Sequence, residues 1–463
     1  MSSEIKKNSI RDKRKALYKP LLIVEAYLVF TIILYIFGPW DWPTHNVLKF
    51  YLLIFLYHIA FISGYFMSMQ NVSFIRLNNN FFVNEEKRNR IIQMIIRYLN
   101  IAIIVYLILA VVNAIRVVGL SGFSPVSYYN EVINGLNNPA GQYFEKFDQG
   151  SLYGGSFLSY ANVLLSPLLW PVIPLSIYYF KELKFNKKVL VILAILLESS
   201  RWVATGTNKG IFDMAFVIIT MLLIKNIFRK PKKTIVRKKY ATWKVAIILI
   251  WPLIYFVDAI SGRLGGDKIN FSTINPNVGI NEESFFMQIM PESFETGLIF
   301  LTSYVTQGYY AMSMALSMPY TPMFGVGNSV FLMSNFKQIS GMEVFQNTYQ
   351  SKVEATFGWA ALNKWHTFYT WIANDVSFIG VIFIMFIIGY IYASVWKDVV
   401  INENPVAITL MALFTIMFAY ISANNQVLSY PTTFTAFWGL IIYWIYSKRK
   451  LRIMDKVVDN NEK

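Results

Sequence analysis

Apolar runs of about 20 residues recur along the chain and are separated by shorter polar stretches. A helix of that length crosses the hydrocarbon core of a bilayer, which is about 30 Å thick. The pattern predicts an all-α polytopic membrane protein with about ten transmembrane helices. The expected spans are residues 20–37, 50–67, 91–112, 156–180, 189–203, 211–227, 245–260, 376–396, 407–421 and 433–446.

Lys and Arg concentrate in alternate polar stretches, and this sets the expected orientation of the chain. They crowd residues 1–19, the stretch 225–244 and the C-terminal Lys448-Arg449-Lys450. Because short basic loops stay on the cytoplasmic side of a membrane, we predict that both termini and the basic loop 225–244 are cytoplasmic. An even number of spans agrees with this placement.

The longest stretch without a predicted span is residues 261–375, which we expect to be external. It separates residues 1–260, which hold the first seven predicted spans and an external loop at 113–155, from residues 376–463, which hold the last three. Residues 295–318 are apolar but are interrupted by hydroxyl and amide side chains. They predict an amphipathic or re-entrant helix within the external segment rather than another span.

Composition agrees with this class. Hydrophobic residues make up 55% of the 463-residue chain and charged residues only 15%, below the share of about a quarter in soluble domains. The net charge of +16 resides mainly in the cytoplasmic clusters, so we expect contact with a lipid bilayer and no nucleic-acid partner. The chain has no cysteine, which excludes disulfides and thiolate chemistry. The first apolar run has full length and no small-residue cleavage site, so an uncleaved first helix is expected.

Four cations are predicted to lie on the external side, against the general trend. Arg201 and Lys209 share the short turn between the fifth and sixth spans, Arg263 follows the seventh span among glycines, and Arg116 follows the third. Arginine grips phosphate groups with paired N–H donors, so these residues predict a pyrophosphate-binding site. The alternatives are interfacial cations that reach toward water or, for Arg263, a cation that compensates a helix C-terminus.

His366 and Asp375 are the candidate general bases, because both lie at the entry to the predicted eighth span. The alternatives are a structural histidine with ordinary hydrogen bonds and an N-cap formed by Asn374 or Asp375.

Aromatic and amide side chains surround these two residues. The candidates for sugar binding are Gln307, Tyr309, Trp365 and Tyr369. Aromatic rings stack on sugar rings and amides bond hydroxyls, but the same aromatic residues are equally typical of the belt at a membrane–water interface.

Several common motifs are absent. The chain has no paired aspartates that would hold a metal with a nucleotide sugar, and its three histidines lack metal-ligand spacing. It also lacks a phosphate-binding Walker loop and a nucleophile elbow. We therefore expect no metal and no cofactor.

The segment that holds these candidates resembles the Wzy-type O-antigen polymerases, also called oligosaccharide repeat unit polymerases. The matching residues are Tyr304-x-x-x-Gly308-Tyr309-Tyr310, Gly325-x-Gly327-x-Ser329, Trp365-His366-Thr367, Trp371-x-x-Asn374-Asp375-x-x-Phe378-x-Gly380 and the turn Gly206-Thr207-Asn208-Lys209-Gly210. The resemblance extends to the chain length, the number of spans and the large late external segment. Ser200-Arg201 resembles a pair in this family, although the bulky Trp202-Val203 that follows departs from it.

The resemblance implies a GT-C-like, metal-independent glycosyltransferase in the bacterial plasma membrane, with its active site on the external face. Such an enzyme transfers a growing glycan from polyprenyl pyrophosphate, such as undecaprenyl pyrophosphate, to the terminal sugar hydroxyl of a new lipid-linked repeat unit. The product is a surface polysaccharide, either the O-antigen of lipopolysaccharide or a capsule. A flippase and a chain-length regulator are the expected partners.

Two other classes remain open from the sequence. An O-antigen ligase uses the same donor chemistry with a different acceptor. A polysaccharide flippase or other transporter would place more charges within the spans and would lack a large external segment.

Overall fold

The computed structural model of the chain describes residues 2–70, 85–119, 122, 124–148, 157–228, 236–263, 275, 278–289 and 291–461. This part of the chain is mainly α-helical, as the sequence predicts. The helices are α1 (Ser2–Phe37), α2 (Val47–Gln70), α4 (Glu85–Val118), α5 (Pro125–Asn137), α6 (Pro139–Asp148), α7 (Phe157–Leu169), α8 (Val172–Tyr178), α9 (Phe185–Ala204), α10 (Lys209–Phe228), α11 (Val236–Arg263), α12 (Phe285–Ile289), α13 (Glu292–Ala315), α14 (Val330–Ser340), α15 (Tyr349–Phe357), α16 (Phe368–Asn402), α17 (Pro405–Ala419) and α18 (Pro431–Asn461). Two short strands, β1 (Trp40–Asp41) and β2 (Gly279–Ile280), pair antiparallel.

Five helical stretches of the described chain are long and apolar enough to cross a membrane, and each overlaps a predicted span. They are Ala16–Phe37, Val47–Gln70, Arg88–Val118, Ser159–Tyr178 and Phe368–Asn402. Two shorter apolar stretches, Ile250–Gly262 and Pro405–Ala419, overlap two further predicted spans. The chain is thus an all-α protein whose long apolar helices suit a lipid bilayer.

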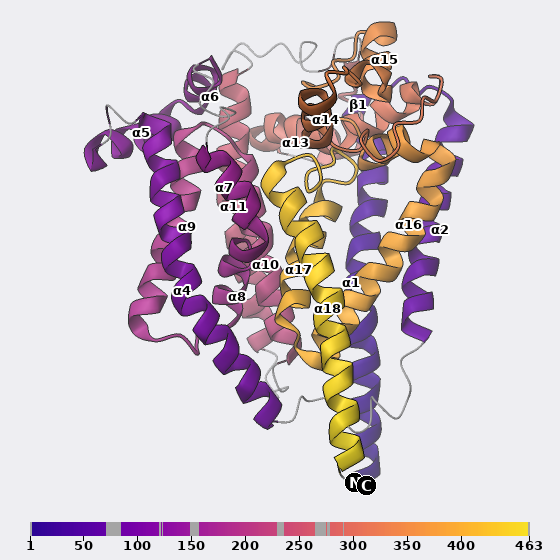
Figure 1. Cartoon of the computed structure of the whole chain (residues 1–463). Helices are drawn as coiled ribbons and strands as arrows, with labels where there is room; N and C mark the ends of the chain where they lie inside the picture. The colour runs from indigo at the N-terminus through magenta and orange to yellow at the C-terminus, as the bar shows by residue number, and fades with distance from the viewer. Residues whose placement is uncertain are drawn as a thin grey trace.

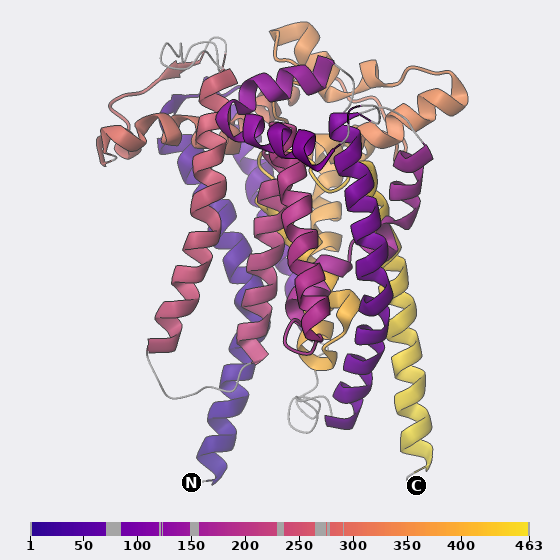
Figure 2. The same ribbon diagram turned by 90° about the vertical axis from the view of Figure 1, so that its left-hand side faces the viewer.

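The long helices lie side by side in one bundle, and both ends of the chain lie at the same end of it (Figures 1 and 2). The opposite end carries the short helices α5, α6, α14 and α15, and we refer to it as the cap end. The sequence predicts only a loop at residues 113–155. The structure instead continues α4 to Val118 and folds α5 and α6 beyond it, with Ser124 capping α5.

The core of the bundle is built on the close packing of α2 against α16. A Cβ added at Gly64 would lie 2.0 Å from the carbonyl oxygen of Phe386, and one added at Gly389 would lie 2.1 Å from that of Phe61. Small residues let two apolar helices approach until their backbones touch. In a membrane the hydrophobic effect contributes little to helix association, so this close van der Waals packing stabilises the pair. Helix α17 is buried along almost its whole length and packs between α10, α16 and α18.

Helix α16 begins eight residues before the predicted span and is kinked. Its N-cap is Thr367, whose hydroxyl accepts the Thr370 N–H at 3.1 Å. Asn374 and Asp375 therefore lie inside the helix, and neither caps its start. Ser377 breaks the helical backbone with a φ of 63°, an uncommon conformation for a residue other than glycine.

Helix α13 corresponds to the stretch that the sequence predicts as amphipathic or re-entrant. It lies across the cap end (Figures 1 and 2), from Gly297 against Val257 of α11 to Leu316, whose carbonyl accepts a hydrogen bond from Lys49 of α2. It is buried on most sides rather than on one face. Its hydroxyl side chains donate to carbonyls of the preceding turn, which satisfies them without water.

Candidate functional site

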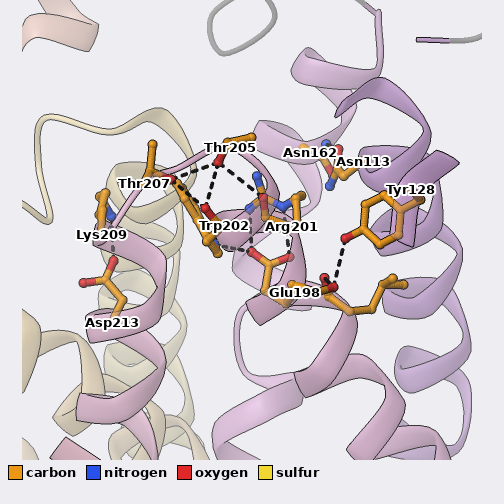
Figure 3. Close-up of polar contacts among 12 residues, drawn as sticks. Asn113, Tyr128, Asn162, Glu198, Arg201, Trp202, Thr205, Thr207, Lys209 and Asp213 are labelled. Atoms are coloured by element: carbon orange, nitrogen blue, oxygen red, sulfur yellow. Dashed lines mark hydrogen bonds and ion pairs between the residues drawn. The ribbon is translucent and has the colours of Figure 1, made fainter. Parts of the chain in front are cut away.

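The turn between α9 and α10 lies against α6 at the cap end, since a Cβ added at Gly206 would lie 2.1 Å from the carbonyl oxygen of Pro139. The two cations singled out in the sequence lie on either side of it (Figure 3). Gly206 has a φ of 61° and makes the tight reversal possible. The Thr205 hydroxyl donates to the carbonyls of Arg201 and Trp202 at 3.2 and 3.1 Å. The turn is therefore fixed by its own side chains, and the cations at its two ends are held in place.

Arg201 is paired with a carboxylate one turn earlier on α9. Its Nη2 lies 2.5 Å from Oε1 of Glu198 and its Nε lies 3.4 Å from Oε2. The Trp202 indole also donates to Oε1 of Glu198 at 2.9 Å, and the guanidinium stacks on the Trp202 ring at 4.3 Å. The Arg201 and Glu198 side chains are only 21% and 18% exposed, so this is a largely desolvated pair.

Lys209 forms the second pair. Its Nζ lies 2.6 Å from Oδ2 of Asp213, one turn further along α10, and both side chains are 15% exposed. The ammonium also lies over the ring of Tyr430 at 4.3 Å, where the ring quadrupole attracts it. We call Glu198, Arg201, Lys209 and Asp213 together the hairpin site.

The two carboxylates of the hairpin site differ in one respect. Both oxygens of Glu198 accept hydrogen bonds. In Asp213, Oδ1 is buried and has no hydrogen-bond partner among the described residues, and the same holds for Oδ1 of Asn208 in the turn. Figure 3 shows the second Asp213 oxygen directed away from Lys209. Buried acceptors without partners are uncommon and call for a ligand or water.

Neighbouring helices supply further polar groups around the pairs (Figure 3). Tyr128 of α5 shares a hydrogen bond of 2.9 Å with Ser200, and Asn162 of α7 donates to Asn113 of α4 at 3.2 Å. Tyr420, which follows α17, lies close enough to Asp213 for the carboxylate charge to act on its phenol. The hairpin site is thus lined by hydroxyls and amides as well as by its four charges.

Two of the residues predicted to bind sugar are core residues. Tyr309 is 1% exposed, and its hydroxyl shares a hydrogen bond of 2.9 Å with Thr31. Tyr369 is fully buried and packs against Tyr57 with ring centroids 4.8 Å apart. In this structure neither ring presents a face to a ligand.

The other two candidates contact each other. Trp365 is half-buried, and its ring meets that of Tyr304 edge-on at 5.5 Å. The buried Gln307 accepts the Trp365 N–H at 3.3 Å.

The two predicted bases are engaged differently. Nε2 of His366 donates to the carbonyl of Ala360 at 3.3 Å, so Nδ1 carries the lone pair, and it has no partner. Burial lowers the pKa of His366 from its ordinary 6.5 to about 4. The imidazole is therefore neutral at physiological pH and weakly basic.

The Asp375 carboxylate is hydrogen-bonded to the loop that precedes α14. Its Oδ1 accepts the N–H groups of Gly325 and Gly327, both at 2.8 Å, and its Oδ2 accepts from the Asn328 amide at 2.7 Å. The preceding residue Asn374 donates to the carbonyl of Gly327 at 2.9 Å. The Gly325-x-Gly327 motif therefore meets Asp375 in space, although about 50 residues separate them in the chain.

Arg116 and Arg263 are the remaining two predicted cations. Arg116 lies in the last turn of α4 and is half-buried, and α4 packs against α9. Arg263 is the last residue of α11, and its side chain lies outside the described part of the chain. Lys209 lies close enough to Glu198 for its charge to act on that carboxylate, so the structure brings Arg201 and Lys209 into one site.

Glu198 and Asp213 are the residues that the sequence prediction left out. The signal was available, because a carboxylate three or four residues from a cation on a helix lies on the same face. Among the residues that the structure describes, no three His, Asp or Glu side chains are grouped so as to hold a metal ion.

No family model, curated protein or solved structure matches this chain. The class that the fold and composition define is that of an α-helical protein with several membrane-length apolar helices.

Proposed function

We propose that this protein is a repeat-unit polymerase of the Wzy type, which builds a surface polysaccharide on a polyprenyl-pyrophosphate carrier. It transfers the growing glycan from its carrier to the terminal sugar hydroxyl of a new lipid-linked repeat unit. The observation that carries this proposal is the hairpin site, with two largely buried cations held at the end of the bundle opposite both chain termini. The resemblance of the residues between 301 and 380 to this enzyme family supports it.

The chemistry of the reaction needs cations at such a place. When the glycosidic bond to the carrier breaks, negative charge develops on the departing pyrophosphate, and preorganised cations stabilise it. Arginine has five N–H donors, and Glu198 engages those on Nε and Nη2 of Arg201. The donors on Nη1 are outside this pair and are proposed to bind phosphate oxygens, while the Thr205 and Thr207 hydroxyls hold the turn through the carbonyl of Trp202.

The carboxylate partners have a role of their own in this proposal. Two unpaired cations in a largely desolvated site would be costly to the apo protein, and each partner offsets that cost. The site is close to neutral before the pyrophosphate arrives. Arg116 and Arg263 then serve as additional contacts to the carrier phosphates, while Gln307 and Trp365 contact sugars.

The orientation of the chain follows from the same proposal. Both termini and the basic loop 225–244 are cytoplasmic, about ten spans cross the membrane, and the cap end is external. The placement of both termini at one end of the bundle supports an even number of crossings. An external site meets substrate after a flippase has moved the lipid-linked repeat unit across.

Deletion of the gene tests the proposal directly. Surface polysaccharide from the deletion strain, separated on a gel, is expected to collapse from a ladder to a single repeat unit. Wild-type protein on a plasmid restores the ladder. An unchanged ladder contradicts the proposal, full-length polymer retained on its lipid carrier identifies a ligase, and loss of every external repeat unit identifies a flippase.

A further inference from the structure

We infer that Asp213 is the general base that accepts the proton of the attacking sugar hydroxyl. This inference rests on the proposed function, because it names the group that activates the acceptor in the same reaction. Asp213 was not among the bases expected from the sequence. It is identified by its oxygen atoms and by its neighbours.

The two carboxylates of the hairpin site differ in how their oxygens are engaged. Both oxygens of Glu198 accept hydrogen bonds, from Arg201 and Trp202. Asp213 is held through Oδ2 by Lys209 at 2.6 Å, while its buried Oδ1 has no partner. One anchored oxygen and one unpartnered acceptor are what a base needs in order to be positioned and still able to receive a proton.

The surroundings of that oxygen are polar. Asn208, just before the same helix, also has a buried amide oxygen without a partner among the described residues. Tyr420 and Tyr430 both lie close enough to Asp213 for its charge to act on their phenols. Acceptors and hydroxyl groups together suit a ligand that carries several hydroxyls, such as a sugar, because it donates and accepts at once.

The two bases expected from the sequence are less suited to this step. All three N–H contacts of the Asp375 carboxylate come from one loop, so a hydroxyl would have to displace them. His366 also has a buried, unpartnered acceptor, Nδ1, but its ring is held by a 3.3 Å hydrogen bond to the Ala360 carbonyl, whereas a 2.6 Å ion pair with Lys209 anchors Asp213. The carboxylate also lies next to Lys209 and within one site with Arg201, where the pyrophosphate is proposed to bind.

The step balances as a single displacement. The acceptor oxygen forms a bond to the anomeric carbon of the donor glycan, and its proton passes to Oδ1 of Asp213. The bond between that carbon and the pyrophosphate oxygen breaks, and the electron pair leaves with polyprenyl pyrophosphate. Lys209 keeps the carboxylate oriented, and Arg201 stabilises the leaving group.

The experiment uses purified full-length protein in proteoliposomes, with the lipid-linked repeat units that the deletion strain accumulates as substrate. Asp213→Asn keeps an oxygen for Lys209 but removes the base. We expect kcat to fall by about 10²–10⁴-fold, the range of general-base contributions, with KM changed by less than about threefold. Asp213→Glu retains a carboxylate and is expected to recover part of the rate.

Asp258→Asn is the matched control, because Asp258 is an exposed carboxylate on α11, which packs against α10. It is expected to polymerise at the wild-type rate, and melting curves check that all variants are folded. Polymerisation by Asp213→Asn at the wild-type rate, or equal losses in Asp213→Asn and Asp258→Asn, would overturn the inference alone. Absence of polymer from the wild-type protein would overturn the proposed function as well.

Discussion

At the scale of single residues, Arg201 and Glu198 hold opposite charges in a largely desolvated contact, so neither can be removed without consequence for the other. Arg201→Gln leaves Glu198 buried without its partner, and we expect a loss of about 3 kcal/mol in the free energy of unfolding together with loss of polymer. The double variant Arg201→Gln/Glu198→Gln removes both charges. It should regain most of that stability and still make no polymer.

Melting curves in detergent and the polysaccharide ladder separate these two effects. If the double variant regained both stability and polymer, Arg201 would be a structural cation rather than a pyrophosphate ligand. If the single variant kept full stability, the pair would contribute little to the fold.

The pKa of His366 predicts how stability depends on pH. Burial lowers it to about 4 in the folded protein, against an ordinary value of 6.5. The unfolded chain therefore binds a proton first as the pH falls, and the free energy of unfolding drops by about 3 kcal/mol between pH 6.5 and pH 4. His366→Gln should remove this part of the pH dependence.

Thermal melts of the wild type and the variant between pH 4 and pH 7.5 provide the measurement. Parallel curves for the two proteins would mean that the histidine is protonated equally in the folded and unfolded states. That outcome would contradict its burial.

At the scale of elements, the kinked start of α16 is joined to the loop before α14. Asp375→Asn places an amide donor against the Asn328 amide, which also donates, and leaves that contact unsatisfied at a cost of about 1–3 kcal/mol. The exchange Asp375→Asn/Asn328→Asp restores a donor opposite an acceptor, although it removes the Asn328 contact with the Gly325 carbonyl at 2.9 Å. We expect this double variant to recover both stability and polymer.

This exchange distinguishes a positioning residue from a base. A base at position 375 would be lost in the single and the double variant alike, so the ladder would stay collapsed in both. Recovery in the double variant alone would assign Asp375 to holding the loop.

The bounds of the helices show how much of the structure the sequence could predict. Apolar runs are a local signal, and the bounds predicted for the hairpin, 189–203 and 211–227, fall within α9 and α10. The start of α16 was predicted too late, because Asn374 and Asp375 interrupt the apolar run just before Val376, although the helix continues through them to the buried residues before them. Whether a side chain is buried or exposed depends on its tertiary neighbours, and the periodicity of the sequence does not show which residues those are.

The candidate site was predictable to a similar degree. Arg201 and Lys209 were recognised because they are cations in a turn predicted to be external, and the structure places them in one site. Tyr309 and Tyr369 were ambiguous between a belt and a sugar surface, and the structure gives each a buried neighbour, Thr31 and Tyr57. Those partners lie far away in the chain, so only the fold identifies them.

At the scale of the whole molecule, the proposed function requires the cap end to be external. The chain has no cysteine, so single cysteines can report orientation without background. Gln338 in α14 is exposed at the cap end, and Lys184 is exposed just before α9 at the end that carries the termini. We expect a membrane-impermeant maleimide to label Gln338→Cys in intact cells or spheroplasts, and Lys184→Cys only after lysis.

This experiment tests orientation independently of activity, since neither residue belongs to the hairpin site. The cysteine-free wild type is the control for background, and restoration of the ladder by each variant confirms that it is folded. Labelling with the opposite pattern would put Arg201, Lys209 and Asp213 on the cytoplasmic side. There they would meet repeat units before export, and a polymerase acting on exported substrate would be ruled out.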